Sequence, residues 1–362
     1  MITAELSIAI VEPFYGGSHK YWVDQLEKRL SFKTKSYTLP GRHWKWRMSA
    51  GALYLAKEVN ESNLEYDLFL VSDMLDVPLF KSLLVDKYRE AKIVIYMHEN
   101  QVVYPFQTLD KNKNWDRHYG LINFKSMLCA DEVWFNSSFH RDVLLSEMET
   151  FLHPFPESKY LISLLKRISS RSHILPIGYD RKELEMHKSD KAEVPTILWN
   201  HRWEYDKNPE AFFEALFKLS EDEVSFDLIV CGETYSKQPE IFKIARSKLA
   251  NQIKHWGYFD TRTDYVKALW QSTILPVTSN QEFFGLSVLE AIFCQVTPIM
   301  PNRLSYSSIY GNRFDYYSSD DEFYEILKQT VVSPQSRDNS VDDLCWSAVI
   351  QLYEQRLLKV GR

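Results

Sequence analysis

Short apolar runs alternate with longer amphipathic segments along the chain. In the first half, the runs expected to form strands are Leu6–Val11, Leu68–Val71, Ile93–Met97 and Glu132–Phe135. Between them apolar residues recur at helical spacing, and the expected helices are Tyr21–Leu30, Arg47–Glu58, Leu79–Tyr88, Tyr119–Leu128 and Phe139–Glu149. Strands and helices that alternate in this way predict a parallel sheet with helices on both faces.

The same alternation starts again in the second half. A polar stretch without apolar periodicity separates the halves, and we interpret Gly178–Glu193 as the connection between two domains. The strands expected after it are Thr196–Trp199, Phe226–Val230, Ile253–Trp256, Ile274–Val277 and Thr297–Met300. The expected helices are Pro209–Leu219, Glu240–Leu249, Thr263–Trp270, Leu286–Phe293 and the final segment Val341–Leu358.

The pattern predicts an α/β protein made of two doubly wound, Rossmann-like domains. We expect residues 1–178 to form the first domain and residues 179–340 the second, with a C-terminal helix at 341–362. A chain of 362 residues also favours two cores over one. Ligands of such sheets bind beyond the carboxyl ends of the strands, so we expect the site in the cleft between the domains.

Composition and charge narrow the class of protein. The net charge of −6 argues against a protein that coats nucleic acid, although a local basic patch could still attract RNA. Cys129, Cys231, Cys294 and Cys345 lie far apart, so we expect reduced thiols and neither a disulfide framework nor a zinc site. No apolar run approaches the ~20 residues of a membrane span, and the N-terminus lacks a basic signal-peptide region. We therefore expect a cytoplasmic protein without a membrane partner.

The strongest chemical signal is a pair of carboxylates, Glu282 and Glu290, separated by seven residues that include Gly285. The segment follows an expected strand and opens an expected helix, so its backbone N–H groups and the helix dipole can attract phosphate. Glu290 can accept hydrogen bonds from ribose hydroxyls and Glu282 from sugar hydroxyls. An ordinary amphipathic helix behind a solvent-facing glutamate would give the same pattern.

A second loop places two cations, Arg202 and Lys207, after the expected strand Thr196–Trp199. Fixed cations at such a position stabilise the negative charge that develops on a leaving nucleoside diphosphate. The alternative is a pair of solvated surface side chains, but the position at a strand end favours the functional interpretation.

Two loops of the first domain also follow expected strands. Gly16 and Gly17 allow close approach of backbone to a ligand, here the donor, or simply form a tight turn. The segment His98–Gln101 places four polar side chains at a strand terminus, where His98 could contact a transferred sugar or its leaving phosphate. The chain contains no H-E-x-x-H motif and no D-x-D pair, so we expect no metal.

A fifth segment, Leu39–Arg47, interleaves tryptophan with basic residues. If exposed, it would suit stacking on RNA bases and contacts to phosphates; if buried, the tryptophans are core. The candidate RNA-binding residues are Arg42, Trp44, Lys45, Trp46 and Arg47.

Together these segments resemble the retaining GT-B glycosyltransferases that carry the E-x7-E motif. The corresponding residues are Gly16-Gly17, Pro176–Asp180, Arg202, Lys207, Glu282 and Glu290. The longer segments Ala9–Lys20, Leu39–Arg47 and His98–Gln101 resemble one branch more closely, the tRNA-queuosine mannosyltransferase family. This resemblance implies a GT-B fold whose last helix returns to the first domain.

The resemblance also implies a reaction: transfer of mannose from GDP-mannose, with retention and without a metal, to the cyclopentene diol of queuosine at the tRNA wobble position. By the same resemblance Glu290 would hold the donor ribose, Glu282 the sugar, and Arg202 and Lys207 the diphosphate. His98 would contact the mannose. The amides of Gly17, Phe284, Gly285 and Leu286 would complete the cradle of the diphosphate.

Two alternatives remain open at this stage: a glycosyltransferase with another nucleotide-sugar donor and a small-molecule or lipid acceptor, and a catalytically silent module that binds RNA or a nucleotide sugar. One residue also departs from the family pattern, because Gln295 follows Cys294 where the wider family commonly has glycine. If the backbone there needs a positive φ, glutamine would be strained.

Overall fold

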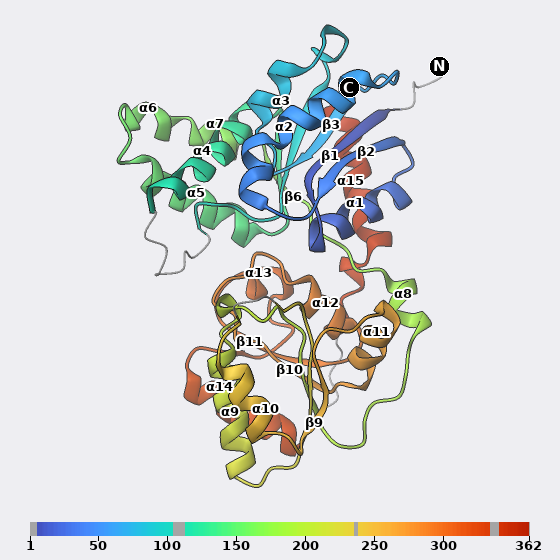
Figure 1. Ribbon diagram of the computed structural model, residues 1–362, viewed down its shortest axis with the longest axis vertical. Coiled ribbons are helices and arrows are strands. Elements are labelled where there is room, and N and C mark those ends of the chain that lie inside the picture. The colour runs from blue at the N-terminus through green and yellow to red at the C-terminus, as the bar shows by residue number, and fades with distance from the viewer. Residues whose placement is uncertain (1–5, 104–112, 235–237, 334–339, 362) are drawn as a thin grey trace. The chain divides into compact units, whose positions relative to one another are not determined.

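The computed structural model describes residues 6–103, 113–234, 238–333 and 340–361 (Figure 1). The chain forms two compact units. The first, here the N-terminal unit, comprises Met1–Gly178 and Trp346–Arg362, and the second, the C-terminal unit, comprises Tyr179–Cys345. Among the described helices, none is long and apolar enough to cross a lipid bilayer.

The N-terminal unit is built on a parallel sheet with the strand order β2-β1-β3-β4-β5-β6. Its strands are β1 (Ser7–Tyr15), β2 (Lys33–Pro40), β3 (Leu68–Ser72), β4 (Lys92–Met97), β5 (Glu132–Phe135) and β6 (Ser172–Ile174). β3 is buried along its whole length, because helices cover both faces of the sheet and leave no face for polar residues.

The helices of this unit lie between its strands in the chain. They are α1 (Gly17–Arg29), α2 (Trp44–Glu61), α3 (Val77–Leu83), α4 (Lys113–Cys129), α5 (Ser138–Leu152), α6 (Ser158–Ser163) and α7 (Leu165–Ser169). Local sequence signals fix several starts. Asp76, for example, caps α3 by accepting a hydrogen bond from the Leu79 amide over 3.2 Å.

The C-terminal unit repeats the architecture with the strand order β12-β11-β10-β7-β8-β9. Its strands are β7 (Thr196–Trp199), β8 (Asp227–Val230), β9 (Ile253–Trp256), β10 (Ile274–Pro276), β11 (Thr297–Pro301) and β12 (Tyr316–Tyr317). Its helices are α8 (Arg181–Met186), α9 (Pro209–Glu221), α10 (Ile241–Lys248), α11 (Arg262–Gln271), α12 (Leu286–Phe293), α13 (Tyr306–Tyr310) and α14 (Asp320–Val332).

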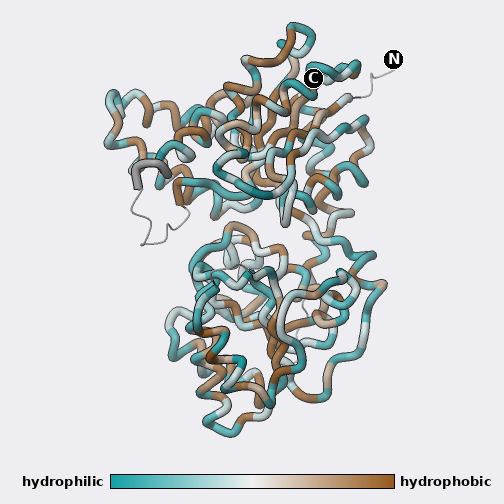
Figure 2. Tube along the Cα trace, viewed as in Figure 1, coloured by the Kyte–Doolittle hydropathy of each residue, from teal (hydrophilic) through white to brown (hydrophobic). Residues whose placement is uncertain are grey.

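Each unit has its own hydrophobic core. Figure 2 shows the apolar segments concentrated along the strands, with hydrophilic residues on the outer turns of the helices. In the N-terminal unit the core includes Val71, Ile95 and Phe135 from three neighbouring strands. In the C-terminal unit it centres on Trp199, whose ring lies 4.9 Å from that of Phe212.

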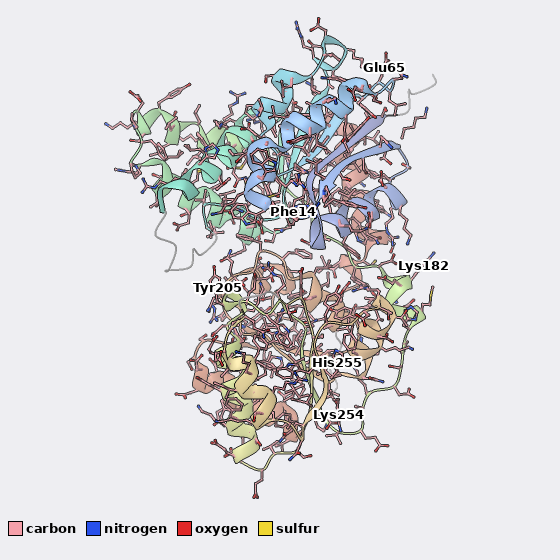
Figure 3. All side chains as sticks on the ribbon, viewed as in Figure 1. Phe14, Glu65, Lys182, Tyr205, Lys254 and His255 are labelled. Atoms are coloured by element: carbon pink, nitrogen blue, oxygen red, sulfur yellow. The ribbon has the colours of Figure 1, made fainter. Side chains whose placement is uncertain are left out.

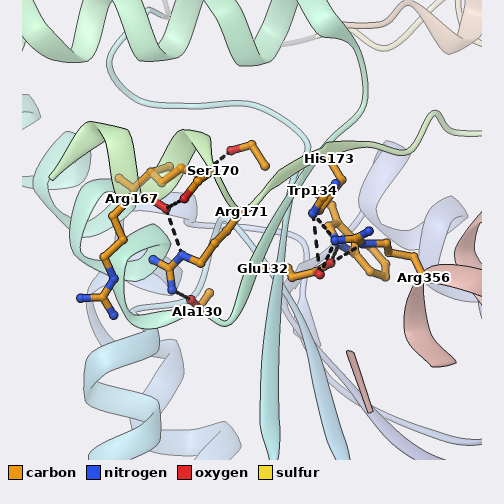
Figure 4. Close-up of polar contacts among 10 residues, drawn as sticks. Ala130, Glu132, Trp134, Arg167, Ser170, Arg171, His173 and Arg356 are labelled. Carbon is orange, nitrogen blue, oxygen red and sulfur yellow. Dashed lines mark hydrogen bonds and ion pairs between the residues drawn. The ribbon is translucent and has the colours of Figure 1, made fainter. Parts of the chain in front are cut away.

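The last helix, α15 (Trp346–Val360), belongs to the N-terminal unit. Arg356 donates from its Nε to Glu132 at the start of β5 over 2.7 Å, and its guanidinium also lies against His173 of β6 (Figure 4). Tyr353 is buried, and its hydroxyl accepts a hydrogen bond from Trp22 Nε1 of α1 over 3.2 Å. The expected return of the C-terminal helix to the first domain is thus observed.

The strand orders place one topological switch point in each sheet. In the N-terminal unit it lies between β1 and β3, and in the C-terminal unit between β7 and β10. Loops leave these neighbouring strands toward opposite faces of the sheet, and ligands of doubly wound sheets bind in the crevice that this opens. The predicted site residues of the C-terminal unit follow β7 and β10.

Several parts of the fold differ from the sequence prediction. β2 was not expected, and Arg181–Met186 was expected to be an irregular connection but forms the short helix α8, capped by Asp180. The concern about Gln295 is resolved geometrically, because the residue has φ 62° and ends α12 in the left-handed conformation. Glutamine thus occupies a position that favours glycine.

Candidate active site

The centre of the C-terminal unit's switch point is a buried lysine. Lys207 follows β7, and its Nζ lies 3.2 Å from Asp206 Oδ2 and 3.2 Å from Glu282 Oε2, which follows β10. It also donates to the carbonyl of Gln281 over 2.9 Å. Because β7 and β10 are neighbours in the sheet, Lys207 and Glu282 lie in contact although they are 75 residues apart in the sequence.

These contacts keep both partners ionised. Burial alone would lower the pKa of Lys207, but the carboxylates of Glu282 and Asp206 outweigh it and raise the pKa. Burial alone would raise the pKa of Glu282, but Lys207 and the Phe284 amide lower it. A buried cation that is held charged at a strand end can stabilise an anionic leaving group.

Arg202 lies on the same loop, which also carries Tyr205 (Figure 3). Its guanidinium contacts Glu204 Oε2 at 3.1 Å and Asp206 Oδ2 at 3.6 Å, and its side chain is 41% exposed. Arg202 and Lys207 thus share one carboxylate, Asp206. The sequence prediction that both cations meet on one loop is supported by this geometry, with one cation buried and the other accessible.

The loop from Glu282 to Leu286 turns into helix α12. Gly285 is the N-cap residue and has φ 85°, which glycine adopts without strain. Glu282 Oε1 accepts hydrogen bonds from the amides of Phe283 at 3.1 Å and Phe284 at 3.2 Å. The Phe284 amide, expected to bind phosphate, therefore binds the side chain of Glu282 in this structure, whereas Leu286 begins the helix as expected.

The second glutamate of the motif, Glu290, is buried in α12 and carries an ion pair that the sequence did not suggest. Arg262, the first residue of α11, donates from Nη1 to Glu290 Oε2 over 3.1 Å and from Nη2 to Glu290 Oε1. The same Nη2 lies 3.1 Å from Glu183 Oε2 of α8. Glu290 is thus close to the other motif residues in sequence, but its orientation is set by a distant element.

The switch point of the N-terminal unit carries a buried polar cluster. Glu12 of β1 accepts from Ser72 Oγ at 2.9 Å, and its other oxygen lies 3.0 Å from Nδ1 of His19 in α1. The rings of His19 and His98 lie 4.0 Å apart, and the His98 amide donates to Asp73 Oδ1 over 2.9 Å. His98, a predicted site residue, is only 7% exposed.

The titratable side chains of this cluster differ in their protonation. Burial alone would lower the pKa of His19, but the carboxylate of Glu12 outweighs it and raises the pKa to about 9. Burial and the neighbouring His19 hold the pKa of His98 well below its ordinary value, so His98 is neutral. Burial also raises the pKa of Asp73 to about 8. Both ring nitrogens of His98 and Oδ2 of Asp73 are buried without a hydrogen-bond partner among the described residues, as expected where a ligand binds.

Glu12, His19 and His98 each offer one potential metal ligand, and these atoms lie within 4.8 Å of one another. One feature disfavours a metal. The raised pKa of His19 keeps its ring protonated at neutral pH, with Nδ1 donating to Glu12, and a protonated nitrogen cannot ligate a metal.

The glycines of the first loop have different roles. Gly16 packs against Gly41, where an added Cβ would lie 3.1 Å from the Gly41 Cα, so close backbone packing requires its small size. Gly17 has φ 53°, and apart from its chain neighbours and its own helix backbone, no atom of the described residues lies within 4 Å of the position a Cβ would take. Of the two, Gly17 has the open space that a bound donor needs.

The basic aromatic segment spans the start of α2. Trp46 is 55% exposed, whereas Trp44 is half-buried, with its ring 5.1 Å from that of Tyr119. Lys45 is exposed, with Nζ 5.4 Å from the centre of the Trp44 ring. Arg42 is exposed and Arg47 half-buried, its Nε donating to the Pro40 carbonyl over 3.2 Å. A direct stacking role is therefore available to Trp46.

Sequence reasoning missed several residues of both clusters. Arg262, Asp73 and the pairing of Glu12 with His19 were not singled out, because each depends on how neighbouring elements pack in the folded chain and not on spacing. One sequence signal could have identified Arg262. It is a cation in the first turn of a helix, where the helix dipole disfavours positive charge, so a nearby anion is expected.

Comparisons with known proteins identify the family of the chain. Residues 7–179 match a family model described as the N-terminal region of tRNA-queuosine alpha-mannosyltransferase, and residues 181–331 match the group 1 glycosyl transferases. The chain is 34% identical over 351 residues to the tRNA-queuosine alpha-mannosyltransferase of Drosophila melanogaster, covering 93% of this chain and 91% of that protein.

Solved structures share the fold at low sequence identity. Sucrose-phosphate synthase from Thermosynechococcus elongatus is 13% identical, with a TM-score of 0.69 over 98% of this chain and 100% of its own. A glycosyltransferase from Rickettsia africae is 15% identical, with a TM-score of 0.64 over 99% of both chains. The predicted GT-B fold is confirmed.

Proposed function

Because the chain belongs to the tRNA-queuosine alpha-mannosyltransferase family, we propose that it transfers mannose from GDP-mannose to the cyclopentene diol of queuosine at the tRNA wobble position. The C-terminal unit supplies most of the donor contacts, and the N-terminal unit supplies the acceptor contacts together with Gly17 and His98. The anomeric configuration of the mannose is retained.

The observation that carries this proposal is the buried, charged Lys207 beside Arg202 at the switch point of the C-terminal sheet. When the bond between the anomeric carbon and the β-phosphate oxygen breaks, negative charge develops on that oxygen. Cations already fixed by Asp206 and Glu282 stabilise this charge without reorganising at the moment of reaction. Such stabilisation acts on the transition state more than on the intact donor.

The remaining donor contacts follow from the same loops. Glu290 accepts hydrogen bonds from the ribose and Glu282 from the sugar. The amides of Gly17, Gly285 and Leu286 donate to the diphosphate, and the Phe284 amide does so when Glu282 turns from its own loop to the sugar. Backbone amides at the N-terminus of α12 suit an anion because they have no earlier carbonyl to bind.

His98 contacts the transferred mannose in this proposal. A neutral imidazole offers one donor and one acceptor, and both ring nitrogens of His98 are buried and unpartnered among the described residues. Burial and the charged His19 beside it lower the pKa of His98 and favour its neutral form. Sugar hydroxyls, which both donate and accept, match such a group.

We propose that catalysis needs no metal, because Arg202 and Lys207 supply the positive charge that a divalent cation would otherwise supply. We also propose a cytoplasmic location. None of the four cysteines forms a disulfide in the described structure, and Cys231, Cys294 and Cys345 are buried, as suits a reducing compartment.

The start of α2 contacts the tRNA. Trp46 stacks on an unpaired base, and Arg42, Lys45 and Arg47 contact phosphates. Trp44 is half-buried, and its packing on Tyr119 fixes the start of α2 in place. Exposed aromatic rings beside cations are the usual means of binding single-stranded RNA such as an anticodon loop.

A mass shift on tRNA tests the reaction, the donor and the acceptor together. The full chain is incubated with GDP-mannose and queuosine-containing tRNA after treatment with a chelator, and the digested nucleosides are weighed. A hexose on queuosine supports the proposal, and tRNA that carries guanosine in place of queuosine should gain none. Donor hydrolysis without transfer would contradict the acceptor, and transfer only after a divalent metal is restored would contradict metal independence.

A further inference from the structure

The ion pair between Arg262 and Glu290 has no role in the reaction as described above. The Glu290 side chain is 5% exposed, and both of its oxygens face one guanidinium, whereas the Arg262 side chain is 38% exposed. Bidentate pairs of this kind fix the plane of the carboxylate as well as its charge. The guanidinium is held in turn by Glu183 at 3.1 Å and lies 5.1 Å from the centre of the Tyr265 ring.

The pair leaves room for a second set of donors. A carboxylate has about four lone-pair positions, and a bidentate guanidinium takes one on each oxygen. One position therefore remains on each oxygen of Glu290. The 2′- and 3′-hydroxyls of a ribose are two neighbouring donors, so they match the two positions that Arg262 leaves.

We propose that Arg262 is a positioning residue for the donor ribose, which fixes Glu290 in the orientation that accepts both ribose hydroxyls. This inference rests on the proposed function, because it assumes that Glu290 binds the ribose. Without Arg262, the buried carboxylate would rotate or take up a proton, since an unpaired buried charge is unfavourable. It would then lose the geometry that recognises a ribose.

Recognition of the ribose is measured as a ratio of two dissociation constants, for 2′-deoxy-GDP and for GDP, by calorimetry. A hydrogen bond from a hydroxyl to a charged acceptor corresponds to about tenfold or more in affinity, so the parent ratio should be about 10 or higher. In Arg262→Ala the ratio should fall toward one. Arg262→Lys keeps the positive charge but loses the bidentate geometry of the guanidinium, so its ratio should lie between those of the parent and of Arg262→Ala.

Kinetics provide the second readout. A positioning role in ground-state binding predicts that Arg262→Ala raises the KM for GDP-mannose and leaves kcat within about threefold of the parent. Arg181→Ala is the matched control, since Arg181 also pairs with two carboxylates of the C-terminal unit, Glu185 and Asp342. It should leave the dissociation-constant ratio, the KM and kcat unchanged.

A parent-like ratio in a folded Arg262→Ala or Arg262→Lys protein would overturn the inference. So would tighter binding of GDP by Arg262→Ala, because Arg262 would then block the ribose and not position its partner. Glu290→Ala separates the inference from the proposed function: if this variant keeps the parent ratio, Glu290 does not bind the ribose at all. If the ratio falls in Glu290→Ala but not in Arg262→Ala, Glu290 binds the ribose and only the positioning role of Arg262 is refuted.

Discussion

The left-handed conformation of Gln295 gives the sharpest prediction about stability. The residue lies one position beyond Cys294, the C-cap of α12, where its φ is 62°. The Gln295 amide donates to Ile292 over 2.9 Å, and the Val296 amide donates to Ala291 over 3.0 Å. This is the Schellman pattern of helix ends, which usually contains glycine at the left-handed position.

The magnitude follows from two opposing terms. A residue with a Cβ in the left-handed region is destabilised by roughly 1–2 kcal/mol, and glycine removes that strain. Glycine also gains freedom in the unfolded chain, which offsets about 0.4–1 kcal/mol. The Gln295 side chain is exposed, so its removal loses little packing. We expect Gln295→Gly to stabilise the C-terminal unit by about 0.5–1 kcal/mol, which corresponds to a Tm increase of roughly 1–4 °C.

Differential scanning calorimetry of three proteins tests this. Gln295→Ala is the control because alanine removes the same side chain but keeps the Cβ, so its transition should stay close to that of the parent. The reasoning is wrong if Gln295→Gly melts at or below the parent temperature. It is also wrong if alanine stabilises as much as glycine, since the gain would then come from loss of the glutamine side chain.

Three further substitutions test the site. Lys207→Ala should reduce turnover by about 10²–10³; a near-parental rate in a folded protein would refute its role at the leaving group. Trp46→Ala should weaken binding of tRNA by about tenfold or more, whereas Leu53→Ala, also exposed on α2, should have little effect; equal losses would rule out specific stacking. Asp73 has a folded-state pKa raised to about 8 from about 3.8, so the folded state binds the extra proton and stability falls as pH rises through that window. Asp73→Asn should therefore lose less stability than the parent between pH 5 and pH 8 in urea unfolding, and identical slopes would show that Asp73 does not titrate there.

Most of the fold could be predicted because strands buried on both faces are continuous apolar runs. Thr196–Trp199 and Glu132–Phe135 were predicted with the observed bounds. β2 was missed because it is an edge strand, and its polar residues lie at the exposed positions. Helix α14 was also missed, although Ser319 caps it and apolar residues at Phe323, Leu327 and Val331 recur every four residues. The capping serine could therefore have been used to predict this helix.

The site could be predicted only in part, since spacing places a residue in the chain but not beside its partner. Arg202 and Lys207 were expected together because they share one loop. The contact of Lys207 with Glu282 needs β10 to lie beside β7, and a sequence does not give strand order. The position of Asp73 beside His98 likewise depends on the pairing of β3 with β4.

Both carboxylates of the E-x7-E motif are held by a cation from another element: Glu282 by Lys207 and Glu290 by Arg262. An unpaired carboxylate at either position would be destabilising, so each cation contributes to the stability of the C-terminal unit as well as to the proposed donor site. Because the pairs form on folding, the donor meets side chains that have already lost their rotational freedom, and less entropy is lost when it binds. Trp46 is organised differently, since it stands exposed on the surface of α2. In the proposed function, the fold therefore holds Lys207 and Glu290 before the donor binds, whereas we expect the exposed Trp46 side chain to become ordered when tRNA binds.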